Sequence, residues 1–238
     1  MSWLSFIVAL ALILPAALHA QARNPAAIPF FPIEPGTRLV YRGHVKYTVP
    51  DSKQAEVREM DVEWPVKVVA VIQKQGFTLI KFEGFPDDLA WYEPGNNPED
   101  HYILQTGEAV YKFGSSEGSK LWAVAETANS AQRLESSINQ EKLWFKLPLR
   151  SGARYCPPGS RQPPMYCWSV ERTQPVQYRV PGSRGKSQTG YTLVYGSLPD
   201  SVTYTVASGI GVLYYRYTHH GTVAEAEVRL KQIQLPPE

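Results

Sequence analysis

Most of the chain alternates between apolar and polar residues with a period of two, which is the pattern of half-buried β-strands. The first clear example covers residues 37–49, where apolar side chains alternate with Arg, His, Lys and Thr. The clearest lies at 222–235, where the sequence reads AEAEVRLK from Ala224 onward. Such stretches recur roughly every ten residues between Pro-, Gly- and Asn-rich turns, as in sandwiches and barrels. We therefore predict an all-β protein, mainly an antiparallel sheet, arranged as a sandwich or half-barrel.

Three stretches depart from simple alternation. Residues 119–143 carry alanines among charged residues and contain neither glycine nor proline, so a minor helical segment is predicted there. Pro65 separates the predicted strands 57–64 and 66–72, and since proline lacks an N–H it indicates a bulge, a corner or a sheet edge. A short strand is predicted at 90–93, before a turn-rich loop.

A short internal echo bears on domain organisation. The segment FPIEPGTR at 31–38 matches LPLRSGAR at 147–154 as apolar-Pro-apolar-x-x-Gly-small-Arg. One interpretation is two related halves, about 30–115 and 146–235, that open with the same turn. The other is coincidence in a chain with 20 prolines and 17 glycines. In both cases residues 23–238 are expected to form a single mostly-β domain.

The first 22 residues read as a secretory signal peptide. The stretch 3–14 is uncharged and long enough for the apolar region of a signal, but too short to span a bilayer. Ala20, Gln21 and Ala22 then provide a small-x-small cleavage site, with cleavage after Ala20 or after Ala22 both open. An uncleaved anchor is the alternative, because no Lys or Arg precedes the apolar run. We expect a secreted or periplasmic protein without a transmembrane span after cleavage.

The two cysteines, Cys156 and Cys167, are expected to form a disulfide, because an exported protein folds in an oxidising compartment. A redox pair would have C-x-x-C spacing, and a metal site would need further Cys or His residues at ligand spacing. His219 and His220 are adjacent, so on a strand they point to opposite faces. No metal ion or cofactor is predicted.

Four segments carry a family resemblance: FPIEPGTRLVYRG, KLPLRSGARY, GIGVLYYRY and GTVAEAEVRLKQI. Together they resemble a diffuse group of uncharacterised secreted bacterial proteins, which have an "FPL..G..W.Y" opening motif and a late "GVG.V.Y" strand. The resemblance implies an exported all-β protein of bacterial origin. It carries no activity across, because the shared motifs are structural.

The charge balance and motifs narrow the function further. A net charge of +2 without a block of Lys and Arg argues against a nucleic-acid partner. The sequence GSSEG at 114–118 fits the G-x-S-x-G motif, in which Ser116 would be the nucleophile of a serine hydrolase. Since the alternating β-α pattern of that fold is missing, a loop is favoured at this site, and enzyme activity stays open with a leaning towards none.

Aromatic side chains are the better lead to a function. Rings with polar tips serve ligand pockets and recognition surfaces, although they also cover sheets as core residues. The candidate ligand surface consists of Trp91, Tyr92, Trp122, Tyr204, Tyr214, Tyr215 and Tyr217. The leading hypothesis is a non-enzymatic periplasmic or extracellular binding module, whose partner is an apolar small molecule or lipid or another envelope protein.

Overall fold

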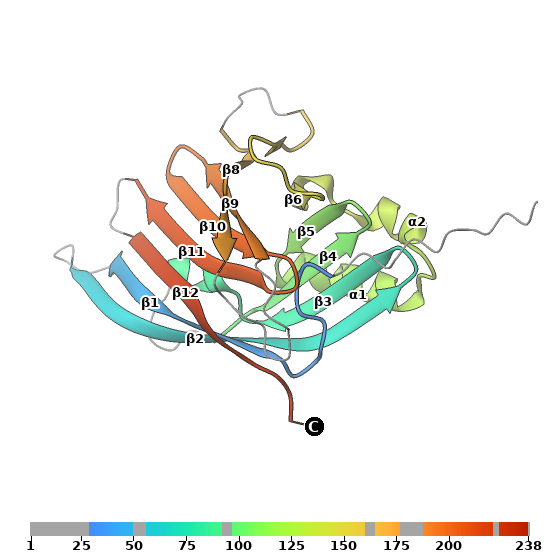
Figure 1. The fold of residues 1–238 in the computed structure, drawn as a ribbon, viewed down its shortest axis with the longest axis horizontal. Helices are drawn as coiled ribbons and strands as arrows, with labels where there is room; N and C mark the ends of the chain where they lie inside the picture. The colour runs from blue at the N-terminus through green and yellow to red at the C-terminus, as the bar shows by residue number, and fades with distance from the viewer. Residues whose placement is uncertain are drawn as a thin grey trace, which may run out of the picture.

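A single twelve-stranded antiparallel sheet organises the protein (Figure 1). The computed structural model describes residues 29–49, 56–91, 97–159, 165–176, 188–220 and 224–237, with side chains omitted at 89–91. The strand order is β6-β5-β4-β3-β2-β1-β12-β11-β10-β9-β8-β7. Consecutive strands therefore pair with each other, except β6 and β7, which stand at the two ends of the order, and β1 pairs in addition with β12.

The strands are β1 (Arg38–Thr48), β2 (Val57–Lys74), β3 (Phe77–Glu83), β4 (Asp100–Thr106), β5 (Ala109–Phe113), β6 (Leu143–Lys146), β7 (Arg154–Tyr155), β8 (Trp168–Val176), β9 (Gln188–Gly196), β10 (Asp200–Ala207), β11 (Gly211–His219) and β12 (Ala224–Gln234). The helices are η1 (Pro86–Trp91), α1 (Ser115–Thr127), α2 (Ala131–Leu134), η2 (Glu135–Ser137) and η3 (Gln140–Lys142).

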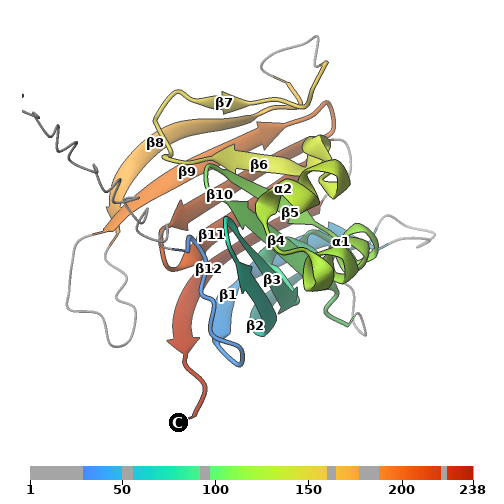
Figure 2. The ribbon, with the colours of Figure 1, turned by 90° about the vertical axis from the view of Figure 1, so that its right-hand side faces the viewer.

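The sheet curves until its two end strands, β6 and β7, approach each other (Figure 2). The hydroxyl of Tyr155 on β7 donates a hydrogen bond of 3.1 Å to the carbonyl of Lys146 on β6. The result is a nearly closed barrel, which confirms the predicted all-β antiparallel class. Of the two arrangements that the alternation allowed, the structure adopts the curved single sheet rather than two stacked ones.

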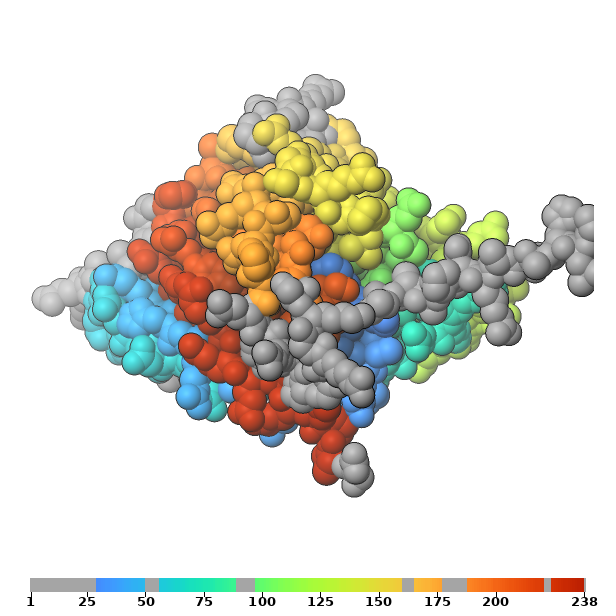
Figure 3. Space-filling view, in the orientation of Figure 1, coloured from blue at the N-terminus to red at the C-terminus, as the bar shows by residue number. Residues whose placement is uncertain are grey.

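Strands β1–β6 and β7–β12 form two successive meanders that meet at the β1–β12 pair. The surface shows this junction directly, with β11 and β12 (red) beside β1 and β2 (blue to cyan) in Figure 3. Below, "first half" means β1–β6 with the helices between them, and "second half" means β7–β12.

The echoed segments form the same turn at the start of each half. The amide of Gly36 donates to the carbonyl of Val68 at 2.8 Å, and the amide of Gly152 donates to that of Val170 at 2.7 Å. Both glycines have a positive φ, +93° and +80°, which side chains disfavour. A register shift follows Val68 in the β2–β3 pair and Val170 in the β8–β9 pair. The local equivalence is a structural fact, and the common origin of the halves stays a prediction.

Two apolar cores lie on opposite faces of the sheet. The larger one fills the concave inner face and draws on both halves; it includes Phe31, Tyr41, Phe82, Trp144 and Val228. The smaller one lies outside β3, β4 and β5, where α1 and α2 cover it (Figure 2). Leu121 and Ala125 of α1 are buried in this outer core, so the helical segment predicted at 119–143 is confirmed.

Two local predictions need correction. Residues 57–74 are one strand, β2, which continues through Pro65 although it lies inside the sheet. This is tolerated because Pro65 pairs with Val40 of β1, while the register with β3 begins only at Lys67. The strand predicted at 90–93 is wrong at Ala90 and Trp91, because the 3₁₀-helix η1 covers Pro86–Trp91, and the rest of that prediction lies outside the described residues.

The start of η1 is explained by its first residues. Proline is favoured at a helix start because its fixed φ suits the first turn. The carboxylate of Asp88 accepts a hydrogen bond of 2.9 Å from the amide of Phe85, while the amide of Asp88 donates to the carbonyl of Phe85 at 3.1 Å. These local bonds outweigh the β preference of the residues that follow.

Within the described ranges, no helix combines the length and apolar character needed to cross a membrane. The predicted signal peptide, residues 1–22, lies outside these ranges.

Candidate functional site

A pocket of about 800 Å³ opens on the concave inner side of the sheet, between the two halves. Its lining comes from η1, from the loop before β4 and from seven strands. The lining residues are Trp64, Asp87, Asp88, Asn97, Glu99, His101, Lys112, Trp168, Tyr195, Val202, Tyr204, Tyr215 and Tyr217. Neither half supplies a complete wall, so the site exists only in the folded whole.

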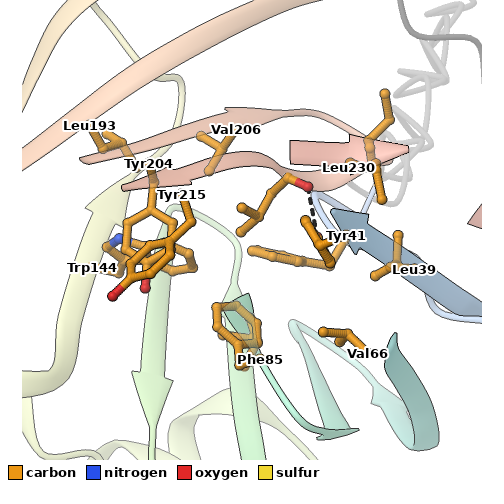
Figure 4. Packing of buried hydrophobic residues seen from close by; sticks show 14 of the residues in the cluster. Leu39, Tyr41, Val66, Phe85, Trp144, Leu193, Tyr204, Val206, Tyr215 and Leu230 are labelled. Atoms are coloured by element: carbon orange, nitrogen blue, oxygen red, sulfur yellow. Dashed lines mark hydrogen bonds between the residues drawn. The ribbon is translucent and has the colours of Figure 1, made fainter. Parts of the chain in front are cut away.

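Buried tyrosines of the second half form one wall. Tyr204 of β10 and Tyr215 of β11 are 2% and 1% exposed, and their ring centroids lie 5.0 Å apart. Figure 4 shows both side chains pointing from their strands toward Trp144 of β6, whose ring lies 4.9 Å from that of Tyr204. Burial, and after it the negative charge of Asp87, raises the pKa of both tyrosines well above the usual value. Their hydroxyls therefore stay protonated.

Asp87 and Lys112 form an ion pair in the pocket lining. Asp87 lies on η1 and Lys112 on β5, and the Lys112 ammonium donates a hydrogen bond to the Asp87 carboxylate. The same ammonium lies 4.9 Å from the ring centroid of Phe85. Burial raises the pKa of Asp87, but the positive charges of Lys112 and His101 lower it by more, so that the pKa lies below its usual value. A charged carboxylate is thus maintained inside the molecule.

A second pair joins η1 to β4, the strand beside β5 in the sheet. Nε2 of His101 on β4 lies 2.5 Å from Oδ1 of Asp88 on η1. One potential ligand atom from each of Asp87, Asp88 and His101 lies within 4.8 Å of the others, the spacing of a cation site. However, Lys112 already binds Asp87, and Asp88 is held by His101 and by the Phe85 amide. We therefore assign these contacts to fixing η1 on the inner face of the sheet.

At the rim, Tyr217 is held by a carboxylate. Its hydroxyl donates to Oδ1 of Asp200 at 2.7 Å, and Nδ1 of His219 lies 2.9 Å from the same oxygen. Burial raises the pKa of Asp200, but its hydrogen bonds with His219, Tyr217 and Ser197 lower it by more. Burial followed by the bond to Asp200 raises the pKa of Tyr217 far above the usual value. The orientation of Tyr217 in the pocket wall is therefore set by its neighbours.

The structure separates the aromatic residues that the sequence singled out. Tyr204, Tyr215 and Tyr217 come together in the pocket. Tyr214 faces the other way, with the guanidinium of Arg229 at 4.4 Å from its ring. Trp122 lies on α1, where it packs against Tyr102 at 6.0 Å and bonds to Glu126.

The other two aromatic candidates cannot be placed. Trp91 ends η1, but its side chain is outside the described part of the chain, and so is the whole of Tyr92. The proposed ligand surface as a whole stays a prediction.

Sequence reasoning missed the charged residues of the pocket. Asp87, Asp88 and Lys112 are not among the predicted site residues. One signal was available: Lys112 interrupts the otherwise apolar strand AVYKF, and a lysine in such a strand needs a carboxylate partner. Identifying that partner required the fold.

Ser116 lies in the first turn of α1 and is exposed to solvent, so the loop favoured at 114–118 is wrong from Ser115 onward. Among the described residues, no histidine or carboxylate is hydrogen-bonded to its hydroxyl. All strand pairs of the sheet are antiparallel, so the turn before α1 lacks the parallel-sheet setting of a nucleophile elbow. The hydrolase interpretation therefore still rests on the sequence motif alone, since no described residue is placed to act as a base for Ser116.

The predicted disulfide between Cys156 and Cys167 is present. Cys156 directly follows β7 and Cys167 directly precedes β8, so the bond ties together the two strands at one end of the sheet. Cys167 is buried, at 2% exposed.

The sequence matches no protein-family model and no curated protein. Two solved structures resemble the fold at 10% sequence identity. One is a protein from Bacteroides fragilis described as exported with a YmcC-like fold, with a TM-score of 0.41; the likeness covers 87% of this chain and 99% of that one. The other is described as a lipoprotein from Parabacteroides distasonis, with a TM-score of 0.33 and the same coverage. At these scores the likeness carries no inference about function.

Proposed function

We propose that this protein is a non-enzymatic binding module that holds a small organic molecule in the inner pocket. The observation that carries the proposal is a pocket of about 800 Å³ walled by aromatic rings of both halves. Ligand sites have this size, and they combine aromatic side chains with convergent polar groups, as the six Trp and Tyr rings and six polar or charged residues of this lining do. The described lining contains no serine, threonine or cysteine, so it lacks the nucleophile of a serine or cysteine hydrolase.

The polarity of the lining bears on the ligand. A purely apolar molecule would displace water from Asp87, Glu99 and Lys112 without replacing its hydrogen bonds, which is unfavourable. The lining therefore supports a ligand that combines an apolar body with a polar or charged group, rather than a bare hydrocarbon.

A pocket-filling variant tests this proposal. Val202 is half-buried in the pocket wall, and V202W should fill the space without adding charge. The probes are three fluorophores of different charge: neutral phenylnaphthylamine, anionic anilinonaphthalene sulfonate and cationic thioflavin T. We expect at least one to bind wild type, and V202W to weaken it about tenfold or more.

The matched control is V69W, because Val69 is 38% exposed on β2 and lies outside the pocket lining. It should bind like wild type. A fluorophore that binds V202W as well as wild type is outside the pocket, and failure of all three to bind would refute the proposal.

We further propose that the protein acts outside the cytoplasm after removal of residues 1–22. The uncharged stretch 3–14 supports export, and the disulfide between Cys156 and Cys167 fits an oxidising compartment. Mass spectrometry of protein secreted by a bacterial host should find a chain that begins at Gln21 or Arg23. An intact Met1 on the exported protein would contradict cleavage.

The alternative function is a serine hydrolase that uses Ser116, supported by the motif at 114–118 and by the exposure of this residue. A fluorophosphonate probe should leave the wild-type protein unlabelled if binding is its function. Labelling of wild type that S116A abolishes would favour the hydrolase instead.

A further inference from the structure

The charged groups of the inner pocket have an uneven balance. The lining carries three carboxylates, on Asp87, Asp88 and Glu99, against the single ammonium of Lys112. His101 adds at most one positive charge, so the lining is net negative whether or not this imidazole is protonated. A ligand that enters the pocket therefore meets a negative field.

The negative charge is concentrated on one residue. Asp87 forms an ion pair with Lys112, and Asp88 is in direct contact with His101. The Glu99 carboxylate forms no ion pair with any residue that the structure describes, and it is exposed at the pocket mouth. Its backbone is held in place, because its carbonyl accepts a hydrogen bond of 2.7 Å from the amide of Gly84.

The aromatic rings of the pocket wall add to the negative electrostatic potential inside the pocket. The rings of Trp168 and Tyr195 lie 5.1 Å apart, those of Trp168 and Tyr204 lie 5.7 Å apart, and Tyr215 follows Tyr204. Each ring has a negative face that attracts cations. Because the wall is largely buried, this attraction is stronger than it would be in water.

The protein already binds one cation of its own in this manner. The ammonium of Lys112 contacts the Asp87 carboxylate and lies 4.9 Å from the Phe85 ring centroid. A carboxylate combined with an aromatic face is thus a cation-holding arrangement at this site. Glu99 and the rings of Trp168 and Tyr195 line the same pocket, so a carboxylate and aromatic faces are both available there, and no described residue forms an ion pair with Glu99.

We infer that the ligand of this pocket is an organic cation, an amine or quaternary ammonium with a small apolar body. The inference rests on the proposed function, since it names the ligand class of the same pocket. The charged group lies between Glu99 and the aromatic wall, and the apolar body lies against Tyr204 and Tyr215. An anion would be repelled by the same groups, and a neutral hydrocarbon would displace water from Asp87 and Lys112 without replacing its hydrogen bonds.

The test compares choline with dimethylbutanol, its neutral carbon isostere, by isothermal titration calorimetry on the full mature chain. The two probes differ in charge and hardly in shape. We expect choline to bind about tenfold more tightly, the preference that a cation–aromatic contact supplies in a desolvated site. E99Q should remove most of this preference by weakening choline binding several-fold, while dimethylbutanol binding stays unchanged.

The matched control is D61N. Asp61, like Glu99, carries an exposed carboxylate, and its side chain is 97% exposed. It lies on the outer face of β2, where it contacts His44. This variant changes the net charge of the protein by the same amount as E99Q does. It should leave both affinities at their wild-type values, because its charge is outside the pocket.

The outcomes separate the two proposals. Equal or tighter binding of dimethylbutanol, or an E99Q variant that binds choline like wild type, overturns the cation inference. If choline is too small to bind measurably, the fluorophores decide: a pocket preference for the neutral or anionic one, blocked by V202W, overturns the inference and leaves the binding proposal intact. Failure of every probe refutes the binding proposal itself.

Discussion

Nε2 of His101 lies 2.5 Å from Oδ1 of Asp88, and the two side chains are only 9% and 15% exposed. The contact joins β4 to η1 and so holds the segment that carries both pocket aspartates against the inner face of the sheet. Breaking a largely buried pair leaves one polar partner without compensation, which costs more than the pair contributes when intact.

Replacing His101 should therefore destabilise the fold. H101L leaves the Asp88 carboxylate facing an apolar side chain, and we expect a loss of about 3 kcal/mol in the free energy of unfolding. Urea denaturation followed by tryptophan fluorescence measures this loss. H44L is the control, because His44 is 48% exposed in its contact with Asp61, and its loss should stay within about 0.5 kcal/mol. Equal losses in the two variants would show that the His101–Asp88 contact does not stabilise the fold.

The Asp87–Lys112 pair predicts a pH dependence. The pKa of Asp87 is lower in the folded than in the unfolded protein, so its contribution is complete above the unfolded pKa of about 3.9 and is lost as pH falls through the folded pKa. K112M should cost about 3 kcal/mol at pH 7, because it leaves a largely buried carboxylate, 25% exposed, uncompensated. The difference from wild type should shrink as pH falls, because burial without Lys112 raises the pKa of Asp87 in the variant, so that the carboxyl is protonated there before it is in wild type.

Chemical denaturation across this pH range provides the measurement. K142M is the control, since Lys142 pairs with Glu117 near the surface, where both side chains are about two-fifths exposed. A constant gap between K112M and wild type from pH 7 to pH 3 would argue against a charged Asp87 in the folded state.

Gly43 is required where the two halves meet. A Cβ atom at this position would lie 1.8 Å from the carbonyl oxygen of Glu227 on β12, so G43A forces β1 and β12 apart. We expect a loss of at least about 3 kcal/mol in the free energy of unfolding, or failure to fold. G107A is the control, because a Cβ there meets no atom within 4 Å. Thermal unfolding distinguishes them, and a G43A variant as stable as G107A would contradict the tight β1–β12 approach.

The disulfide should contribute to stability. It closes a short loop between β7 and β8, and the chain-entropy estimate for its loss is about 2–3 kcal/mol. The double variant C156S/C167S should melt at a lower temperature than oxidised wild type. Adding dithiothreitol should lower the melting temperature of wild type and leave that of the double variant unchanged. A reductant effect of equal size on both proteins would exclude the disulfide as its cause.

Local patterns anticipated the strands well because burial on one face of a strand repeats every second residue. Ala224, Ala226, Val228 and Leu230 of β12 are buried as their alternation predicted. The helical segment at 119–143 could be predicted from composition, since it lacks the residues that break a helix. The strand predicted at 90–93 failed because capping by Asp88 acts through bonds that composition does not reveal.

The sequence allowed only part of the pocket to be predicted. Adjacent Tyr214 and Tyr215 had to face opposite ways, but nothing local says which one faces inward. The register shift between Thr205 and Val206 in the β10–β11 pair is part of the answer, because such a shift changes the side on which later residues fall. The partners of Asp87 and Asp88 lie 25 and 13 residues further along the chain, and no sequence spacing predicts those contacts.

By itself, the sequence determined the all-β class, the helical exception, the expectation of export and the disulfide. Each of these depends on a short stretch of chain: a period, a composition or a pair of cysteines. The tertiary structure alone decided that the single sheet curves until its ends approach, that both halves contribute walls to one pocket, and that carboxylates lie inside it. The physical reason is that an ionised carboxylate is tolerated in the interior only where distant residues supply positive charge and hydrogen bonds, and only the folded sheet brings Lys112 and His101 to Asp87 and Asp88.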